Sequence, residues 1–317
     1  MRAVMMERFG APETLCLAEV ERPAAGPGEV LVRVVAAGVN PVDAKARSGA
    51  LGDLFGMPPF VLGWDVSGVV EGVGAGVVGL ALGDEVFGLA RFPERAGAYA
   101  EYVAVPADEL VHKPSRLDHA VAAGLPLAGL TAQQVLDHAG VEAGQRVLVH
   151  AAAGGVGHLA VQIAKARGAW VIGTARAEKH PFLRELGADE TVDYTATPFE
   201  DVVGDVDVVL DLIGGDYGRR SLRTLRLDGT IVVLLGGDDG LVEAARVAGV
   251  RVVNHLVHPD GPGLARLVEL VERGVLRVVV EQLMPLERAA EAHALIETGR
   301  VRGKIVLSVK PAAGGAR

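Results

Sequence analysis

Residues 146–157, RVLVHAAAGGVG, constrain the fold of this chain more than any other stretch. A short apolar run at 147–149 leads into a turn of small residues and glycines, and then into the helical pattern HLAVQIAKARG. This order lets backbone N–H groups and the positive end of a helix dipole approach a pyrophosphate closely. The stretch therefore predicts a dinucleotide site. The residues expected beside the phosphates are Ala152, Gly154, Gly155, Val156 and Gly157.

Strand and helix patterns alternate after this turn. The apolar, mostly continuous strand runs are 169–174, 190–194, 205–214, 230–237 and 251–258. Such β-α-β repetition is typical of a parallel sheet covered by helices on both faces. We therefore expect an α/β fold with a doubly wound, six-stranded parallel sheet. Its sixth and edge strand would be RVVNHLVH, which is too apolar to be left exposed safely, so we expect a homodimer or a dimer-based tetramer.

The chain before this region follows a different pattern. Residues 2–111 show short alternating or β-branched runs broken by glycine and proline, which predicts an all-β region forming a small barrel. Asp118 can cap a helix that Pro126 then interrupts. The tail after 278 returns to strand patterns and is placed back on the first domain. The expected domains are 1–117, completed by 284–317, and 118–283.

Composition excludes several classes of protein. The formal net charge of −9 argues against nucleic acid or an anionic membrane as the main partner. Cys16 is the only cysteine, which excludes intramolecular disulfides and multi-cysteine metal sites and suits a reducing cytosol. The N-terminal residues show no export signal, so we expect a cytoplasmic location.

Several motifs in fixed order resemble the medium-chain dehydrogenase/reductase family, in its zinc-free quinone oxidoreductase and zeta-crystallin-like branch. The matching stretches are 36–49, 63–74, 97–106, 127–136, 150–169 and 299–307. Ala152 in place of the first glycine is the usual form in that branch. The resemblance implies a GroES-like β-barrel domain joined to a Rossmann domain, with the nicotinamide between them.

No metal is expected. Zinc-containing members of this family need a cysteine and a histidine where this chain has Asn40 and Trp64, and the four-cysteine lobe is missing. His255 and His258 are three residues apart on a predicted strand, so their side chains would point to opposite faces.

The expected coenzyme is NADP(H). An NAD-preferring site would carry an acid near Ala175, whereas Arg176 and Lys179 could attract a 2′-phosphate; the alternative is that both are a solvated helix start. The resemblance implies roles for Lys179 and for Tyr194 at the end of the next strand. Further residues expected in the coenzyme site are Thr174, Leu235, Gly236 and Lys304.

The dihydronicotinamide is the one obvious reactive group, and it donates hydride. Its acceptor should be electron-poor, a quinone or an α,β-unsaturated carbonyl, because an alkoxide would need the missing zinc. The resemblance places Asn40 and Thr131 near the nicotinamide and substrate. Lys45 could stabilise a developing enolate, or simply pair with Asp43; the form NPVDAK is similar to plant alkenal and enone reductases.

Two other functions stay open. One is an NADPH-binding sensor or structural protein with little turnover. The other is a zinc-free enoyl-thioester reductase, which should carry a basic rim for a long phosphorylated carrier.

Overall fold

A computed structural model describes residues 1–52, 54–234 and 240–309, which fall into two compact units. The first unit contains residues 1–130, 258–272 and the chain from 278 on; the second contains 131–257 and 273–277. The breaks at 130, 257, 272 and 277 differ from the expected domain boundaries at 117 and 283, which stay a prediction. Each unit is described by itself.

The second unit is built on the six-stranded sheet that the sequence predicts. Its strand order is β11-β10-β9-β12-β13-β14, all parallel. The strands are β9 (Arg146–Val149), β10 (Trp170–Ala175), β11 (Glu190–Asp193), β12 (Val206–Asp211), β13 (Leu225–Leu234) and β14 (Arg251–His255). The order reverses between β9 and β12, and ligands of such sheets bind at the carboxyl ends of the strands at this point. As expected, β14 is an edge strand.

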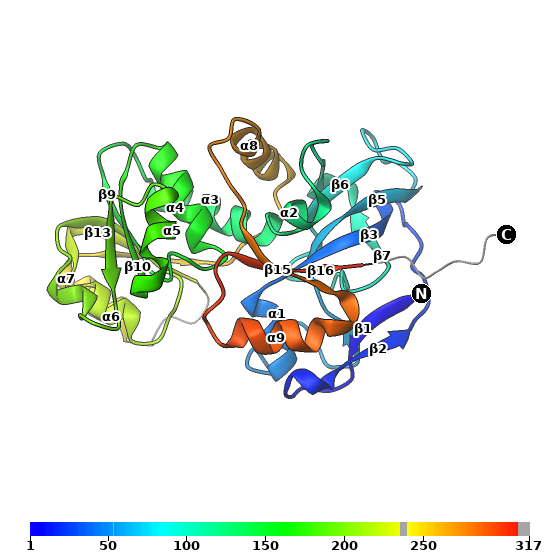
Figure 1. Ribbon diagram of the computed structural model, residues 1–317, viewed down its shortest axis with the longest axis horizontal. Coiled ribbons are helices and arrows are strands. Elements are labelled where there is room, and N and C mark those ends of the chain that lie inside the picture. The colour runs from blue at the N-terminus through cyan, green and yellow to red at the C-terminus, as the bar shows by residue number, and fades with distance from the viewer. Residues whose placement is uncertain (53, 235–239, 310–317) are drawn as a thin grey trace. The chain divides into compact units, whose positions relative to one another are not determined.

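Helices cover both faces of this sheet (Figure 1). They are α3 (Pro126–Ala139), which begins in the first unit, α4 (Gly157–Ala166), α5 (His180–Glu185), α6 (Tyr217–Ser221) and α7 (Leu241–Ala248). In Figure 1, α4 and α5 lie on one face and α6 and α7 on the other, as right-handed crossovers require. The core between them consists of fully buried side chains such as Leu148, Ile172 and Ile231. The helix α7 was not expected from the sequence.

The first unit contains a seven-stranded and a three-stranded sheet. The larger has the order β15-β16-β3-β5-β6-β8, with β7 also paired to β3, and the smaller has the order β2-β1-β4. The strands are β1 (Arg2–Met6), β2 (Leu15–Glu19), β3 (Glu29–Val39), β4 (Phe60–Val61), β5 (Asp65–Val73), β6 (Glu85–Leu89), β7 (Tyr102–Pro106), β8 (Leu110–His112), β15 (Val280–Pro285) and β16 (Lys304–Ser308). The C-terminal strand β16 pairs with β3, so the tail returns to this unit as expected.

In the part of the chain that the structure describes, four α-helices belong to the first unit, besides the start of α3. They are α1 (Pro41–Ser48), α2 (His119–Ala123), α8 (Gly261–Glu272) and α9 (Ala289–Glu297). The expectation that 2–111 is all-β was therefore wrong at α1. Proline at the first position and Asp43, whose side chain accepts from the Asn40 N–H, favour this helix, which ends at the left-handed Gly49 (φ 81°). Asp118 caps α2 as predicted, accepting from the Val121 N–H at 2.7 Å.

Among the described residues, no helix has the length and apolar character needed to cross a bilayer.

Candidate functional site

The glycine turn connects β9 to α4 in the second unit. The Ala152 N–H donates to the Thr174 carbonyl at 3.1 Å, which ties the turn to the end of β10. A Cβ atom on Gly157 would lie 2.3 Å from the Ala151 carbonyl oxygen and 2.7 Å from the Ala152 Cα. The chain's own packing therefore requires glycine at 157, whether or not a ligand is bound.

The same turn leaves donors for an anion. Within the described part of the chain, the N–H groups of Gly155 and Val156 have no hydrogen-bond acceptor, and they immediately precede α4. Donors at the positive end of a helix form a natural phosphate site. The predicted residues Ala152, Gly154 and Val156 lie in this turn, which fits a pyrophosphate.

A basic and aromatic pair lies where the sequence predicts the 2′-phosphate. Arg176 follows β10, and its Nε donates to the Tyr194 hydroxyl at 3.4 Å. Lys179 ends the short helical turn Ala177–Lys179 and is half-buried. Asp193 is in register with Ala175, but its Oδ1 accepts from the Thr195 N–H and hydroxyl at 2.9 and 2.6 Å, which holds the pKa of Asp193 below its usual range.

The remaining predicted coenzyme residues lie in three places. Thr174 is buried at the end of β10. Leu235 and Gly236 lie outside the described residues. Lys304 belongs to the first unit, where its side chain donates to Asn40 and lies 3.3 Å from Asp65.

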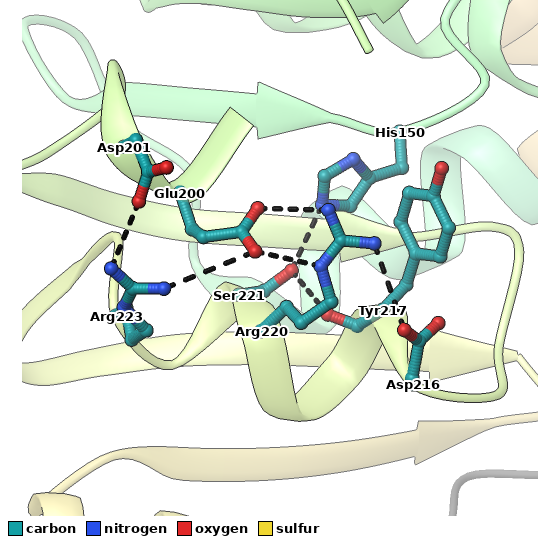
Figure 2. A network of polar contacts seen from close by, with 8 residues as sticks. All are labelled: His150, Glu200, Asp201, Asp216, Tyr217, Arg220, Ser221 and Arg223. Atoms are coloured by element: carbon teal, nitrogen blue, oxygen red, sulfur yellow. Dashed lines mark hydrogen bonds and ion pairs between the residues drawn. The ribbon is translucent and has the colours of Figure 1, made fainter. Parts of the chain in front are cut away.

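His150, directly before the turn, is the centre of a buried network (Figure 2). Its Nδ1 lies 3.1 Å from the Thr174 hydroxyl and its Nε2 2.9 Å from the Ser221 hydroxyl. Burial, with a smaller effect of the Arg220 guanidinium, lowers the pKa of His150 to about 3. The imidazole is therefore neutral, and both of its ring nitrogens are engaged by neighbouring hydroxyl groups.

Asp211, which the sequence analysis did not select, ends β12 at the same edge of the sheet. Its Oδ1 accepts from the N–H groups of Ile213 and Gly214 at 3.0 and 2.9 Å, and burial raises its pKa. The carboxylate thus shapes the loop that follows β12. Its signal in the sequence is an acid that closes a mostly apolar strand.

The first unit contains a second candidate site, a buried polar cluster of Asn40, Asp43, Asp65 and Lys304. The Asn40 amide donates to Asp65 Oδ2 at 2.9 Å and accepts from the Lys304 ammonium, which lies 3.3 Å from the same Asp65 oxygen. The other Asp65 oxygen accepts from the Leu127 N–H at 2.7 Å. Asn40 is therefore held rigidly, and both of its side-chain polar atoms are engaged.

Asp43 adds a second acid to this cluster. It accepts from the Asn40 N–H at 2.7 Å, whereas its Oδ1 and the nearby Tyr99 hydroxyl form no hydrogen bond of normal geometry. Burial raises the pKa of Asp43 to about 7, against smaller lowering effects of the Asn40 N–H, Lys304 and Tyr99. With two carboxyl groups and one ammonium, the cluster is neutral when Asp43 holds a proton.

The other two residues predicted near the substrate are not part of this cluster. Lys45 lies on the exposed side of α1, and its ammonium forms no polar contact within the described ranges. It does not pair with Asp43, which is fully buried. Thr131 is buried on α3 and belongs to the second unit.

The positions compared with zinc ligands carry different chemistry. Asn40 is bound as described above, and Trp64 packs against Phe55 and Phe92 with ring centroids 4.9 and 5.3 Å away. Across residues 1–52, 54–234 and 240–309, no group of three or more histidine, cysteine or acidic side chains could hold a metal ion. His255 instead lies with its Nδ1 3.1 Å from Nδ1 of His138.

Comparison with known families gives two matches. The alcohol dehydrogenase GroES-like domain matches residues 26–115, and the zinc-binding dehydrogenase domain matches residues 186–307. The second description names a metal for which the described residues offer no ligand group.

Individual relatives match nearly the whole chain. An NADPH-dependent alkenal/one oxidoreductase of Arabidopsis thaliana is 38% identical, over 97% of this chain and 79% of its own. The solved quinone oxidoreductase of Coxiella burnetii is 39% identical with a TM-score of 0.94, over 98% of this chain and 99% of its own. That of Escherichia coli, solved with NADPH, is 29% identical with a TM-score of 0.89, over 97% and 100%.

Proposed function

We propose that this chain is an NADPH-dependent reductase of quinones or activated alkenes. It belongs to the medium-chain dehydrogenase/reductase superfamily, and its relatives are quinone oxidoreductases and alkenal/enone reductases. The observation that carries the proposal is the coenzyme site of the second unit. The open N–H groups before α4 suit a pyrophosphate, and Arg176 with Tyr194 suits a 2′-phosphate.

The substrate class follows from the chemistry that the described residues offer. NADPH supplies hydride when bound, and the acceptor must then stabilise negative charge on oxygen. Asn40 and Trp64 offer no metal-ligand set for an alkoxide, which favours acceptors that are already electron-poor. We assign Asn40, Lys45 and Thr131 to the substrate side, with the exposed Lys45 ammonium as the group that can reach an enolate or quinol oxygen.

Steady-state oxidation of NADPH tests the proposal. The acceptors are 1,4-benzoquinone, 9,10-phenanthrenequinone, an alkenal and crotonyl-CoA, each also assayed with NADH. We expect turnover with a quinone or the alkenal. Turnover with crotonyl-CoA alone would indicate the enoyl-thioester reductase, and no turnover with any acceptor would favour an NADPH-binding protein.

Coenzyme choice is tested separately by fluorescence titration. We expect NADPH to bind at least about tenfold tighter than NADH, about 1.4 kcal/mol, and Arg176→Ala to remove most of this preference. Arg184→Ala is the matched control, because this arginine lies on the surface of the same unit, where it donates a hydrogen bond to the Thr191 hydroxyl. Equal affinities of the unmodified protein for the two coenzymes would reject the assignment.

A homodimer and a cytoplasmic location are part of the proposal. The edge strand β14 is accompanied by exposed apolar side chains at Leu227, Val242 and Val247, the last 76% exposed. Pairing of β14 with a second copy would remove the exposed strand edge. The single cysteine is compatible with a reducing compartment.

A further inference from the structure

We infer that His150 is a positioning residue that couples the glycine turn to the segment discriminating NADPH from NADH. The inference rests on the coenzyme site proposed above and assigns a role to a side chain that does not reach the coenzyme, since His150 is completely buried.

The Ser221 hydroxyl, at one end of the network, determines which atom donates and which accepts in each hydrogen bond. The Ser221 hydroxyl donates to the Tyr217 carbonyl at 2.7 Å, so it must accept from His150 Nε2 (Figure 2). A neutral imidazole with its proton on Nε2 has a lone pair on Nδ1, and the Thr174 hydroxyl donates to it. His150 thus has one tautomer and one orientation.

Packing holds the ring in this orientation as well. Phe199 and Tyr217 contact the imidazole edge-on, with centroids 4.5 and 5.2 Å away. The Arg220 guanidinium lies over both aromatic rings and forms two hydrogen bonds to Glu200, at 2.8 and 2.9 Å. Figure 2 shows the Arg220 guanidinium between the Glu200 carboxylate and the Tyr217 ring.

Thr174 carries the coupling between the two ends of the coenzyme site. Its hydroxyl binds His150 at the start of the turn, and its carbonyl accepts from the Ala152 N–H within the turn. The next two residues are Ala175 and Arg176, at the predicted 2′-phosphate end. Two hydrogen bonds therefore fix the distance between the turn and Arg176, and one of them requires the imidazole.

The test uses two variants that remove this link and one that does not. Thr174→Val removes the hydroxyl but keeps the side-chain shape and the carbonyl that binds Ala152; His150→Leu removes the imidazole. Ser221→Ala is the matched control, because it removes the bond from His150 to α6 and the bond from Ser221 to the Tyr217 carbonyl, but leaves the bond between His150 and Thr174 in place. Affinities for NADPH and NADH are measured by fluorescence titration, with the melting temperature of the coenzyme-free protein recorded for each.

We expect Thr174→Val and His150→Leu each to reduce the NADPH-to-NADH affinity ratio by about threefold or more, whereas Ser221→Ala lowers the melting temperature and keeps the ratio. A purely structural role would lower melting temperatures in all three variants without changing the ratio. An unchanged ratio in Thr174→Val, the variant that preserves packing, would overturn the inference even if His150→Leu fails to fold.

Failure of the coenzyme site itself has a different signature. If the proposed coenzyme site is wrong, Arg176→Ala as the only substitution leaves the affinity for NADPH unchanged. If Arg176→Ala does remove the preference, we expect His150→Leu added to it to cause no further loss of ratio. A further, fully additive loss would show that His150 acts independently of Arg176 and would also overturn the coupling.

Discussion

Replacing Asp43 with asparagine should make the stability of this protein less dependent on pH. Burial raises the pKa of Asp43 from its ordinary value of 3.8 to about 7 in the folded protein. The folded state therefore binds the proton more tightly than the unfolded chain. A carboxyl group with a raised pKa destabilises the fold progressively as the pH rises from about 4 to about 7, and not further above that.

The size of the effect follows from these two pKa values. The difference of about three pKa units lowers the free energy of unfolding by about 4 kcal/mol at pH values well above 7. About 2–3 kcal/mol of this loss develops between about pH 5 and pH 8. Asparagine cannot ionise, yet its carbonyl can still accept from the Asn40 N–H and its NH₂ group can donate to the Tyr99 hydroxyl. The variant should therefore gain stability over the unmodified protein as the pH rises.

The assay is urea unfolding of both proteins at about pH 5, 6, 7 and 8, read as the difference in free energy of unfolding. Taking the difference cancels the contributions of His150 and His293 to stability. Burial lowers the pKa of each to about 3, so both proteins lose stability as the pH falls below about 6.5. Glu13→Gln, an exposed acid of the same unit, is the control and should show a constant difference. A constant difference for Asp43→Asn as well would refute the reasoning.

Three further predictions concern metal, turn and assembly. Elemental analysis should find no stoichiometric zinc and chelators should leave activity intact; one tightly bound zinc per chain would mean that Asn40 and Trp64 were misread. Gly155→Val should keep a cooperative melt but weaken the binding of NADPH by about 1–3 kcal/mol. Gly157→Ala should instead lower the melting temperature of the coenzyme-free protein. The reverse pattern in thermal-shift measurements would contradict the turn geometry. Light scattering should give a dimer mass, and a monomer across a wide concentration range would exclude pairing through β14.

The two units differ in how far the sequence predicts them. The sheet of the second unit was predictable because its strands are continuous apolar runs and its turn has a specific pattern, as 146–157 shows. The helix α1 was missed because it is short and its capping residues also suit a turn. The sequence indicated Asn40 near the substrate and Lys304 in the coenzyme site, but not that the two meet each other and Asp65, since Asp65 and Lys304 come from strands far away in the chain and reach Asn40 only through tertiary packing.

The chain order of the first unit has a consequence during synthesis. Residues 36–39 of β3 pair with β16, and Lys304, 264 positions after Asn40, supplies the ammonium that faces Asp65. All six strands of the second unit leave the ribosome before β16, so that unit can form first. Until the last residues emerge, the first unit has an unpaired strand edge and two acids without their cation. A nascent chain stalled near residue 300 should therefore be a target for chaperones, although the sheet of its second unit is already complete.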